Sequence, residues 1–390
     1  MVYLDNNATT RLHPEVLEAM LPYLTEYYAN PSSGYGFSRK VKKAVDTARE
    51  QVAALLGARV EEIIFTSGGT EADNTAIASS LACLPDRKHL IMSEVEHPAV
   101  EQFYQMLETE QSCTTTRLPV NHLGQIDLDQ LENAIQPNQT ALVSLMWANN
   151  ETGVVFPIAE AASRSAAKGV FFHTDAVNAI GKTPINVKDT DIHFLALSAH
   201  KFHGPKGVGA LYANSKVRLK PRVIGGSQES NRRGGTENVA GIVGLGKAAD
   251  LMRQKLENGG HLKVGQLRDQ LETQLKHRLT GVHTNGDPKN RLSNTLSVAI
   301  DGIEAAGLLI MLDEQDVCAS AGSACHTGSL HPSAILSAMG YSRERALGTL
   351  RLSLSSFTTE AELTRAIDLI VESVEKLRAM RTAGSVVVSS

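Results

Sequence analysis

The amino-acid sequence predicts an α/β protein with a large, mostly parallel sheet, and two observations support this class. From about residue 14 to residue 209, helical patterns alternate with short strand-like runs, as in a series of βαβ units. One such run, residues 192–197, is apolar almost throughout, which is typical of a strand covered by helices on both faces. We therefore expect helices on both sides of the sheet and a binding site at the carboxyl ends of its strands.

The elements of this first unit follow from hydrophobic spacing and from the position of turn residues. The expected helices cover residues 14–28, 39–56 and 158–168, with two more that begin near Glu71 and after Pro98. The expected strands cover residues 63–65, 89–92, 141–146, 170–173 and 192–197. This order predicts that successive parallel strands are joined by helices.

A second unit follows a long helical stretch over residues 237–280. This stretch is broken at Asn258, Gly259 and Gly260, a sequence suited to a join between domains. Beyond it we expect strands over 294–300 and 350–354, a helix from about Glu304 and an amphipathic helix over 360–381. The predicted domains are a large one over 14–258, a small one over 1–13 and 259–382, and a tail over 383–390 without a polar pattern.

The composition is that of a globular enzyme. Of 390 residues, 42% are hydrophobic and 21% are charged, and the net charge is −4 without a long basic run. The chain has neither an apolar stretch long enough to cross a bilayer nor the pattern of a signal peptide at its N-terminus. We therefore expect a cytoplasmic protein that binds neither nucleic acid nor membranes. The four cysteines, Cys83, Cys113, Cys318 and Cys325, are too few for a disulfide framework and lack C-x-x-C spacing.

Lys201 is the first candidate for chemistry. It follows the apolar strand over 192–197 and lies in the glycine-rich segment 198–209. A lysine shielded from water at a strand tip can form a Schiff base with an aldehyde cofactor, and pyridoxal phosphate (PLP) fits best. A single lysine in a turn is more often a solvated surface residue, so the assignment depends on the other candidates.

Asp175 supports the same cofactor, because it ends the strand that begins at residue 170 and so points into the crevice expected for Lys201. A carboxylate there keeps a pyridine nitrogen protonated, which makes PLP an electron sink. Asp175 is equally suited to cap the helix that follows, and the two roles are compatible.

Three strand-to-helix junctions carry polar groups suited to the rest of this cofactor. Gly69 and Thr70 open a helix, where backbone N–H groups and the Thr70 hydroxyl can surround a phosphate. His97 precedes Pro98, where an imidazole can stack on a ring and relay protons. Asn150 ends another strand, where its amide can bond a phenolic oxygen. Each of these residues also suits an ordinary turn or helix start.

Two residues of the second unit complete the set. Arg351 alternates with leucines over 350–354, so it faces away from them and can clamp a carboxylate, or it lies on the surface of a half-exposed strand. Cys325 lies in the small and polar segment 318–330, where a cysteine does not fill a core, so it is a candidate nucleophile or an incidental surface thiol. We expect Cys318 to be structural.

Metal and hydrolase chemistry have less support. His200 and His203 are three residues apart, but no further ligand has the spacing of a zinc site. The sequence also lacks a G-x-S-x-G motif.

Taken together, these segments resemble the cysteine desulfurases of the NifS/IscS type, which are class V, fold-type I PLP-dependent enzymes. The resemblance runs from Leu4 to about Phe357. The matching motifs cover residues 4–10, 66–71, 96–97, 149–151, 198–209, 233–238, 322–325 and 351–353, together with the segment around Asp175. The resemblance implies a fold-type I transferase, with a mostly parallel seven-stranded sheet in the large domain and a smaller α/β domain that carries the catalytic cysteine loop.

The resemblance also implies a role for each site residue. Lys201 would hold PLP covalently, Asp175 would pair with its ring nitrogen, and His97 would stack on its ring. Gly69, Thr70, Ser198 and His200 would bind its phosphate, and Asn150 and Asn178 would contact its ring hydroxyl. Arg351 and Asn7 would bind the substrate, Cys325 would take the sulfur, and Thr236 would reach the phosphate of the neighbouring subunit in a homodimer.

Some positions depart from the pattern of this family. Asn178 stands where glutamine is common, so its shorter amide reaches less far toward the ring hydroxyl. Tyr35, Ser230, Ser356, His326 and His331 also replace residues that are frequent there. The long segment around Cys325 resembles the IscS-like group rather than the SufS-like group.

The expected function is that of a PLP-dependent cysteine desulfurase. It would convert L-cysteine to L-alanine and pass the sulfur from a Cys325 persulfide to an acceptor protein, such as an iron–sulfur scaffold or a thiolation enzyme. Two alternatives remain open at this point: a selenocysteine lyase or other class V aminotransferase, and a weakly active scaffold for sulfur transfer.

Overall fold

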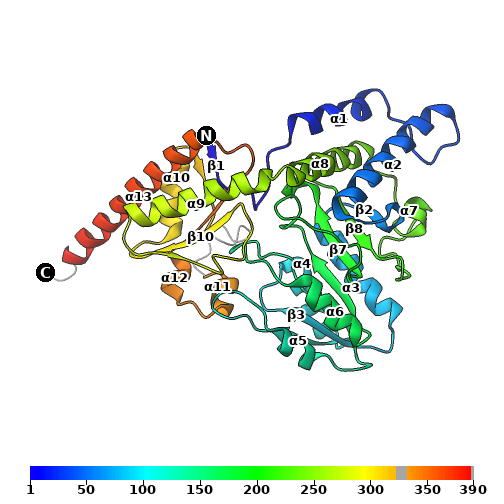
Figure 1. The fold of residues 1–390 in the computed structure, drawn as a ribbon, viewed down its shortest axis with the longest axis horizontal. Coiled ribbons are helices and arrows are strands. Elements are labelled where there is room, and N and C mark those ends of the chain that lie inside the picture. The colour runs from blue at the N-terminus through cyan, green and yellow to red at the C-terminus, as the bar shows by residue number, and fades with distance from the viewer. Residues whose placement is uncertain (322–331, 388–390) are drawn as a thin grey trace.

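The largest element of the fold is a seven-stranded sheet with the strand order β2-β8-β7-β6-β5-β3-β4, at the centre of the larger of two lobes (Figure 1). The structure is a computed structural model and describes residues 1–321 and 332–387. The strands are β2 (Ile63–Thr66), β3 (His89–Ser93), β4 (Thr114–Leu118), β5 (Thr140–Ser144), β6 (Phe171–Asp175), β7 (Phe194–Ser198) and β8 (Gly209–Ala213). Strand β8 is antiparallel to both of its neighbours and the other pairs are parallel, so the predicted α/β class with a mostly parallel sheet is confirmed.

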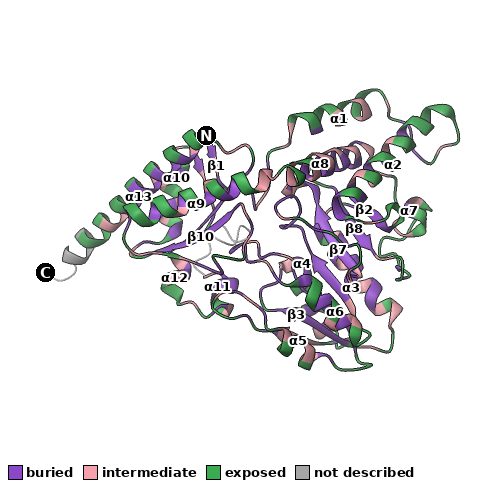
Figure 2. Cartoon of the chain, viewed as in Figure 1, coloured by how far each residue is buried: buried purple, intermediate pink, exposed green. Residues whose placement is uncertain are grey.

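Helices cover this sheet because its central strands are apolar on both faces. Every residue of β3, β5 and β7 is buried (Figure 2). The helices of this lobe are α1 (Pro14–Thr25), α2 (Gly36–Leu56), α3 (Gly69–Cys83), α4 (Pro98–Thr109), α5 (Leu128–Ala134), α6 (Ile158–Ala167), α7 (Gln228–Asn231) and α8 (Val239–Glu257), with a short 3-10 turn at Val60–Glu62. The parallel strands therefore end together at one edge of the sheet, where a site is expected.

The smaller lobe is built on a three-stranded antiparallel sheet, ordered β12-β10-β9, beside a two-stranded parallel pair of β1 and β11. Its strands are β1 (Val2–Tyr3), β9 (Val282–Thr284), β10 (Thr295–Ile300), β11 (Val317–Cys318) and β12 (Thr349–Ser353). Its helices are α9 (Gly260–Arg278), α10 (Ala305–Asp313), α11 (Ala334–Ala338), α12 (Arg343–Leu347) and α13 (Glu360–Val387). The N-terminal strand thus lies in the lobe made by the C-terminal third of the chain (Figure 1).

The helices α8 and α9 lie end to end and connect the two lobes (Figure 1). The predicted break between them is confirmed, because Gly259 has the left-handed conformation with φ +66°. A separate apolar core contains Val2 and Leu4 with residues of α9, β10, β12 and α13. The domain boundaries at 14, 258 and 382 stay a prediction.

The structure contains several elements that the sequence analysis did not predict, among them β4, β8 and the short helices α5, α11 and α12. Strand β4 was not predicted, because its sequence Thr-Thr-Thr-Arg-Leu at the sheet edge has no apolar run and is only partly buried. Strand β8 was not predicted either, because it follows a glycine-rich turn. The helix expected over 360–381 is longer than predicted, since α13 continues to Val387. Within residues 1–321 and 332–387, the structure contains no helix with the length and apolarity needed to cross a membrane.

Candidate active site

Lys201 lies where the sequence predicts it, just past the tip of the buried strand β7. The chain leaves β7 through a short 3-10 turn, Ala199–Lys201, which turns the lysine toward the N-terminal segment. The Lys201 Nζ donates hydrogen bonds to the carbonyl oxygens of Asn7 (2.5 Å) and Ala8 (3.1 Å). The segment after β1 therefore crosses between the lobes and receives the side chain of the candidate anchor.

Asp175 is the last residue of β6, the strand next to β7. Its side chain is buried, and its Oδ1 accepts a hydrogen bond from the backbone N–H of Val177 at 2.8 Å. Burial raises the pKa of this carboxyl, and the nearby positive charges of His97 and Lys201 counteract that rise. One oxygen of Asp175 thus supports the turn after β6, where the described residues 176–193 contain no helix to be capped, and the pairing of Asp175 with a ring nitrogen stays a prediction.

His97 begins helix α4, at the turn that follows β3. Its Nδ1 accepts a hydrogen bond from the Ala99 N–H at 3.1 Å, which is the helix-start role. Burial lowers the pKa of His97, and the Asp175 carboxylate opposes this effect. Because Nδ1 accepts, the neutral imidazole carries its proton on Nε2, which is the atom available for proton transfer.

The turn between β2 and α3 forms one wall of a polar pocket. The pocket is lined by Thr9, Ser67, Gly68, Gly69, Thr70, Glu71, Ser198, His200, Lys206 and Gly207. All four predicted phosphate-binding residues thus lie in one pocket at the N-terminus of a 15-residue helix. Burial, followed by the charge of Lys201, lowers the pKa of His200 to about 4, so its imidazole is neutral at physiological pH.

Gly69 and Gly209 allow this turn to pack closely on the sheet. A Cβ on Gly69 would lie 2.6 Å from the Val177 Cγ2. A Cβ on Gly209 would lie 2.4 Å from the Leu197 carbonyl oxygen and 2.8 Å from the Gly68 Cα. Backbone atoms cannot yield to such contacts, so glycine is required at position 209 and the turn reaches the tip of β7.

Arg351 is buried, so the alternative of a surface arginine is wrong. Only 2% of Arg351 is exposed, and its Nη2 donates to the Asp5 Oδ1 at 2.7 Å while its Nη1 donates to the Asn150 carbonyl oxygen at 3.2 Å. The alternation over 350–354 does not give one exposed face, because both faces of β12 are covered. A buried guanidinium oriented by two oxygens is suited to hold a carboxylate.

Asn7 connects the parts of the site. Its Nδ2 donates to the Asn150 carbonyl oxygen (3.2 Å) and the Thr295 Oγ1 (2.9 Å), and its Oδ1 accepts from Asn294 (3.0 Å) and Lys182 (3.1 Å). These are contacts within the protein, and its role toward a substrate stays a prediction. They show that Asn7 links both lobes to the position of Lys201.

Two buried amide oxygens near the site have no hydrogen-bond partner among the described residues, and they are the Oδ1 atoms of Asn150 and Asn178. A buried polar atom without a partner is costly, so a ligand group is expected to bind there. Together with the lysine at a strand tip, the buried Asp175 and the polar turn at Gly69, these two amides form the set of groups that PLP requires for binding. The residues present therefore fit PLP.

Thr236 lies on an exposed segment next to the phosphate turn. It lines a neighbouring pocket with Ser67, and the adjacent Arg233 pairs with Glu71 of α3 through its Nε and the Glu71 Oε1 at 2.9 Å. This ion pair fixes the segment against the turn. The contact of Thr236 with a second subunit stays a prediction.

Cys325, His326 and His331 lie outside the described residues. The three described cysteines, Cys83, Cys113 and Cys318, are free thiols. Burial raises the pKa of Cys113 and of Cys318, which disfavours the thiolate form. Neither of these two has the character of a nucleophile.

A cluster of buried ionisable groups behind Asp175 was missed by the sequence analysis. The Asp73 Oδ1 lies 3.3 Å from the His173 Nε2, and both side chains are buried. Burial raises the pKa of Glu96 to about 8 and lowers that of His173 to about 3. One signal was available, because His173 is two residues before Asp175 on the same strand and so lies on the same face of the sheet.

Comparisons with known proteins agree with this geometry. The family model described as aminotransferase class V matches residues 2–366. The chain is 52% identical over 380 residues to a cysteine desulfurase of Trichormus azollae, covering 97% of this chain and 94% of that protein. It is 47% identical to the cysteine desulfurase NifS of Azotobacter vinelandii, with 97% and 93% of the chains covered. A solved structure of a NifS-like protein matches with a TM-score of 0.89 and 34% identity, over 96% of this chain and 99% of that one. Because these matches extend over nearly its whole length, this chain belongs to the aminotransferase class V family and, within it, to the cysteine desulfurases.

Proposed function

We propose that this protein converts L-cysteine to L-alanine and receives the sulfur on Cys325 as a persulfide. The observation that carries the proposal is the convergence of Lys201, Asp175 and His97 at the carboxyl ends of β7, β6 and β3, with electrostatic interaction among the three groups. A site with these three groups and a buried arginine suits chemistry at the α-carbon of an amino acid.

PLP would be held by residues from several elements. Lys201 would bind it covalently, Asp175 would face the ring nitrogen, and Asn150 and Asn178 would face the ring hydroxyl. Its phosphate would lie among Gly69, Thr70, Ser198 and His200, which line one pocket. When bound, PLP withdraws electrons from the substrate α-carbon.

The substrate carboxylate would be held by Arg351. The guanidinium is already oriented by Asp5 and by the Asn150 carbonyl oxygen. A planar guanidinium binds a carboxylate with two parallel hydrogen bonds, which fixes the direction of the α-carbon. Asn7 donates to the same Asn150 carbonyl oxygen as Arg351 and so helps to hold it in place.

The Lys201 amine, released when the substrate binds, would move the proton of the α-carbon. His97 would assist at Nε2, because its Nδ1 is occupied by the Ala99 N–H. Burial lowers the pKa of His97, which favours the neutral imidazole, and in that form the Nε2–H would donate a hydrogen bond toward the reacting atoms.

The Cys325 thiolate would then attack the substrate sulfur. A sulfur–sulfur bond forms, the carbon–sulfur bond of cysteine breaks, and its electron pair passes to the carbon skeleton, which is protonated and leaves as alanine. The sulfur would leave Cys325 by transfer to an acceptor protein, such as an iron–sulfur scaffold or a thiolation enzyme. A homodimer, in which Thr236 reaches the partner's phosphate site, would be the working unit.

The experiment is to replace Cys325 by alanine and to measure alanine release from cysteine with and without a reductant. The Cys325→Ala variant should keep bound PLP and still exchange the α-proton of cysteine for deuterium, because Lys201 and Asp175 remain. It should release little alanine and carry no persulfide. Alanine release at the rate of the unmodified enzyme would instead favour a lyase, such as a selenocysteine lyase.

A further inference from the structure

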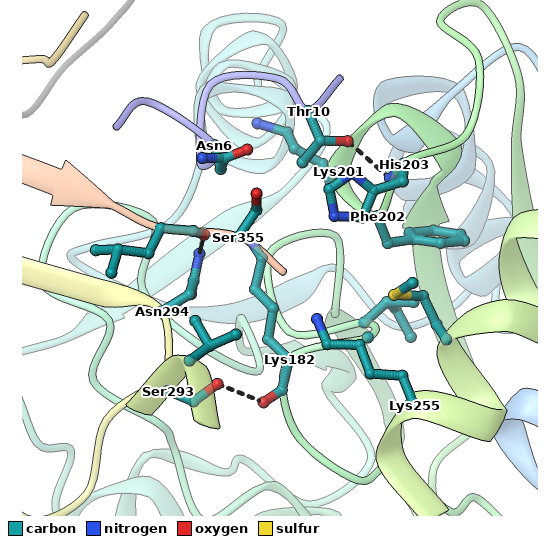
Figure 3. Close-up of a pocket in the computed structure, with 15 residues that line it drawn as sticks. Asn6, Thr10, Lys182, Lys201, Phe202, His203, Lys255, Ser293, Asn294 and Ser355 are labelled. Carbon is teal, nitrogen blue, oxygen red and sulfur yellow. Dashed lines mark hydrogen bonds between the residues drawn. The ribbon is translucent and has the colours of Figure 1, made fainter. Parts of the chain in front are cut away.

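A second, smaller pocket lies at the junction of the two lobes (Figure 3). It is lined by segments that are far apart in sequence: Asn6 and Thr10, Gly181 and Lys182, Phe202 and His203, Lys255 of α8, Ser293 and Asn294, and Leu354 and Ser355. Of the candidate site residues, Lys201 alone is among the described residues that line it. The pocket therefore lies next to the candidate active site, and apart from Lys201 it does not share the residues expected to bind PLP or the substrate.

The ionisable side chains that line this pocket are all basic. Lys182, Lys201 and Lys255 line it together with His203, and the described lining residues include neither aspartate nor glutamate. Figure 3 shows the amine of Lys255 directed into the pocket toward the Lys182 side chain. The amines of Lys182 and Lys255 repel each other when both are protonated, because the described lining residues include no carboxylate.

Lys182 is the most deeply buried of the three lysines that line the pocket. The residue is 8% exposed, and its Nζ donates to the Asn7 Oδ1 at 3.1 Å, an amide oxygen that also accepts from Asn294. Burial lowers the pKa of Lys182, and the positive charges of Lys201, Arg351 and Lys255 lower it further. Burial also lowers the pKa of Lys255 to about 8. An ammonium group in such a place needs a negative partner to remain charged.

The size of the cavity limits the occupant. Its volume of about 20 Å³ suffices for a particle of the size of a water molecule or a small ion. A monatomic anion combines this size with the required charge.

We propose that this pocket binds one small inorganic anion, chloride, between the amines of Lys182 and Lys255. The bound ion would join α8, the connection after β6, the N-terminal segment and the loop before β10. It would thereby fix Asn7, which contacts Lys182 through its side chain and Lys201 through its carbonyl oxygen. This inference does not depend on the proposed function.

Bromide provides a direct probe of the site. Crystals of the holoenzyme grown with bromide in place of chloride should give an anomalous difference peak within hydrogen-bond distance of the Lys182 and Lys255 amines. The absence of a peak in this pocket at saturating bromide would overturn the proposal.

Thermal unfolding tests the site in solution. The Tm of the holoenzyme should rise by about 1–2 °C, and saturate, as chloride replaces gluconate at constant ionic strength. Lys255→Met should abolish this rise. Lys247→Met is the matched control, because Lys247 lies on the same helix but pairs with Glu15 outside the pocket (2.8 Å), and it should keep the rise. A rise that persists in Lys255→Met, or that does not saturate, would also overturn the proposal.

Discussion

The hydrogen bonds of Lys201 and Arg351 show how single residues at this site depend on the N-terminal segment. Lys201 donates to the carbonyl oxygens of Asn7 and Ala8, and Arg351 pairs with Asp5. A short stretch near the start of the chain therefore orients both the proposed cofactor anchor and the proposed carboxylate clamp. Substitution of Lys201 should therefore affect the binding of PLP, and substitution of Arg351 should affect the binding of cysteine.

Lys201→Ala should fold but should lose the visible absorbance of covalently bound PLP. The side chain removed is partly buried, its partners are the carbonyl oxygens of Asn7 and Ala8, and it belongs to none of the apolar core clusters, so the core should be unaffected. Lys216→Ala, at an exposed lysine after β8, is the control and should keep the absorbance. Absorbance spectra and thermal unfolding of both variants make the comparison. Covalent PLP in Lys201→Ala would contradict the assignment of the anchor.

Arg351→Ala should weaken cysteine binding by roughly 2–5 kcal/mol, because a substrate carboxylate would lose its charged partner in a buried place. Arg351→Lys should give a smaller loss, since the charge remains while the two parallel hydrogen bonds are lost. The KM for cysteine and the Tm of both variants are the measurements. An unchanged KM in Arg351→Ala would assign the residue a structural role through Asp5 alone.

At the scale of elements, the ends of β3, β6 and β7 gather ionisable groups that the helices then bury. Glu96 lies in the turn between β3 and α4, where its Oε1 accepts from the Ser93 hydroxyl (2.6 Å) and the Met146 N–H (2.9 Å). Burial raises its pKa to about 8, and the carboxylate of Asp175 adds to that rise. Because Glu96 stays protonated and neutral, it does not repel a negative charge on Asp175, and Asp175 can be the ionised carboxylate of the two.

Glu96 should make the stability of the protein depend on pH. The pKa of Glu96 is raised in the folded state. The protonated carboxyl therefore contributes fully to the free energy of unfolding below the pKa that Glu96 has in the unfolded chain, and this contribution is lost as the pH rises toward 8. Glu96→Gln, which stays neutral, should gain stability relative to the unmodified protein by more than about 1 kcal/mol between pH 5 and pH 8. Urea unfolding at several pH values measures this difference. The exposed neighbour variant Glu94→Gln should show no such trend, and a flat difference for Glu96→Gln would refute the predicted protonation.

At the scale of the whole molecule, the site lies where two lobes and the N-terminal segment meet. Asn7 and Asn294 bring the smaller lobe against Lys182 of the larger one. Thr236 is exposed beside the phosphate turn and is held there by the pair of Arg233 and Glu71. An exposed residue at such a position is available to a second subunit.

Mixed dimers test the predicted role of Thr236. If Thr236 serves the partner's site, a dimer of one Lys201→Ala chain and one Thr236→Val chain contains one complete site, formed by the intact Lys201 and the intact Thr236. Its activity should then exceed that of either homodimer and approach half of the unmodified dimer. If Thr236 serves its own chain, the mixed dimer should be no more active than half of the Thr236→Val homodimer. Subunit-tagged purification and alanine release distinguish the two results.

Local patterns in the sequence were enough to predict the α/β class, most of the strands and the positions of Lys201 and Asp175 at the sheet edge. It could do so because buried parallel strands are continuous apolar runs, and a polar residue directly after such a run must lie at the edge of the sheet. Local spacing also predicted the break at Gly259, since it depends on the backbone of a few residues.

The burial of Arg351, the junction made by Asn7 and the pocket of Lys182 and Lys255 could not be predicted from local patterns, because they arise when the two lobes come together. Arg351 lies on a strand whose two faces are both covered, a fact that its alternation with leucine does not contain. Lys182 and Lys255 are ordinary lysines in sequence, and their unusual environment arises from segments hundreds of residues apart, such as Asn6 and Ser355. Burial and charge depend on these distant contacts, so they are properties of the folded chain and not of its local pattern.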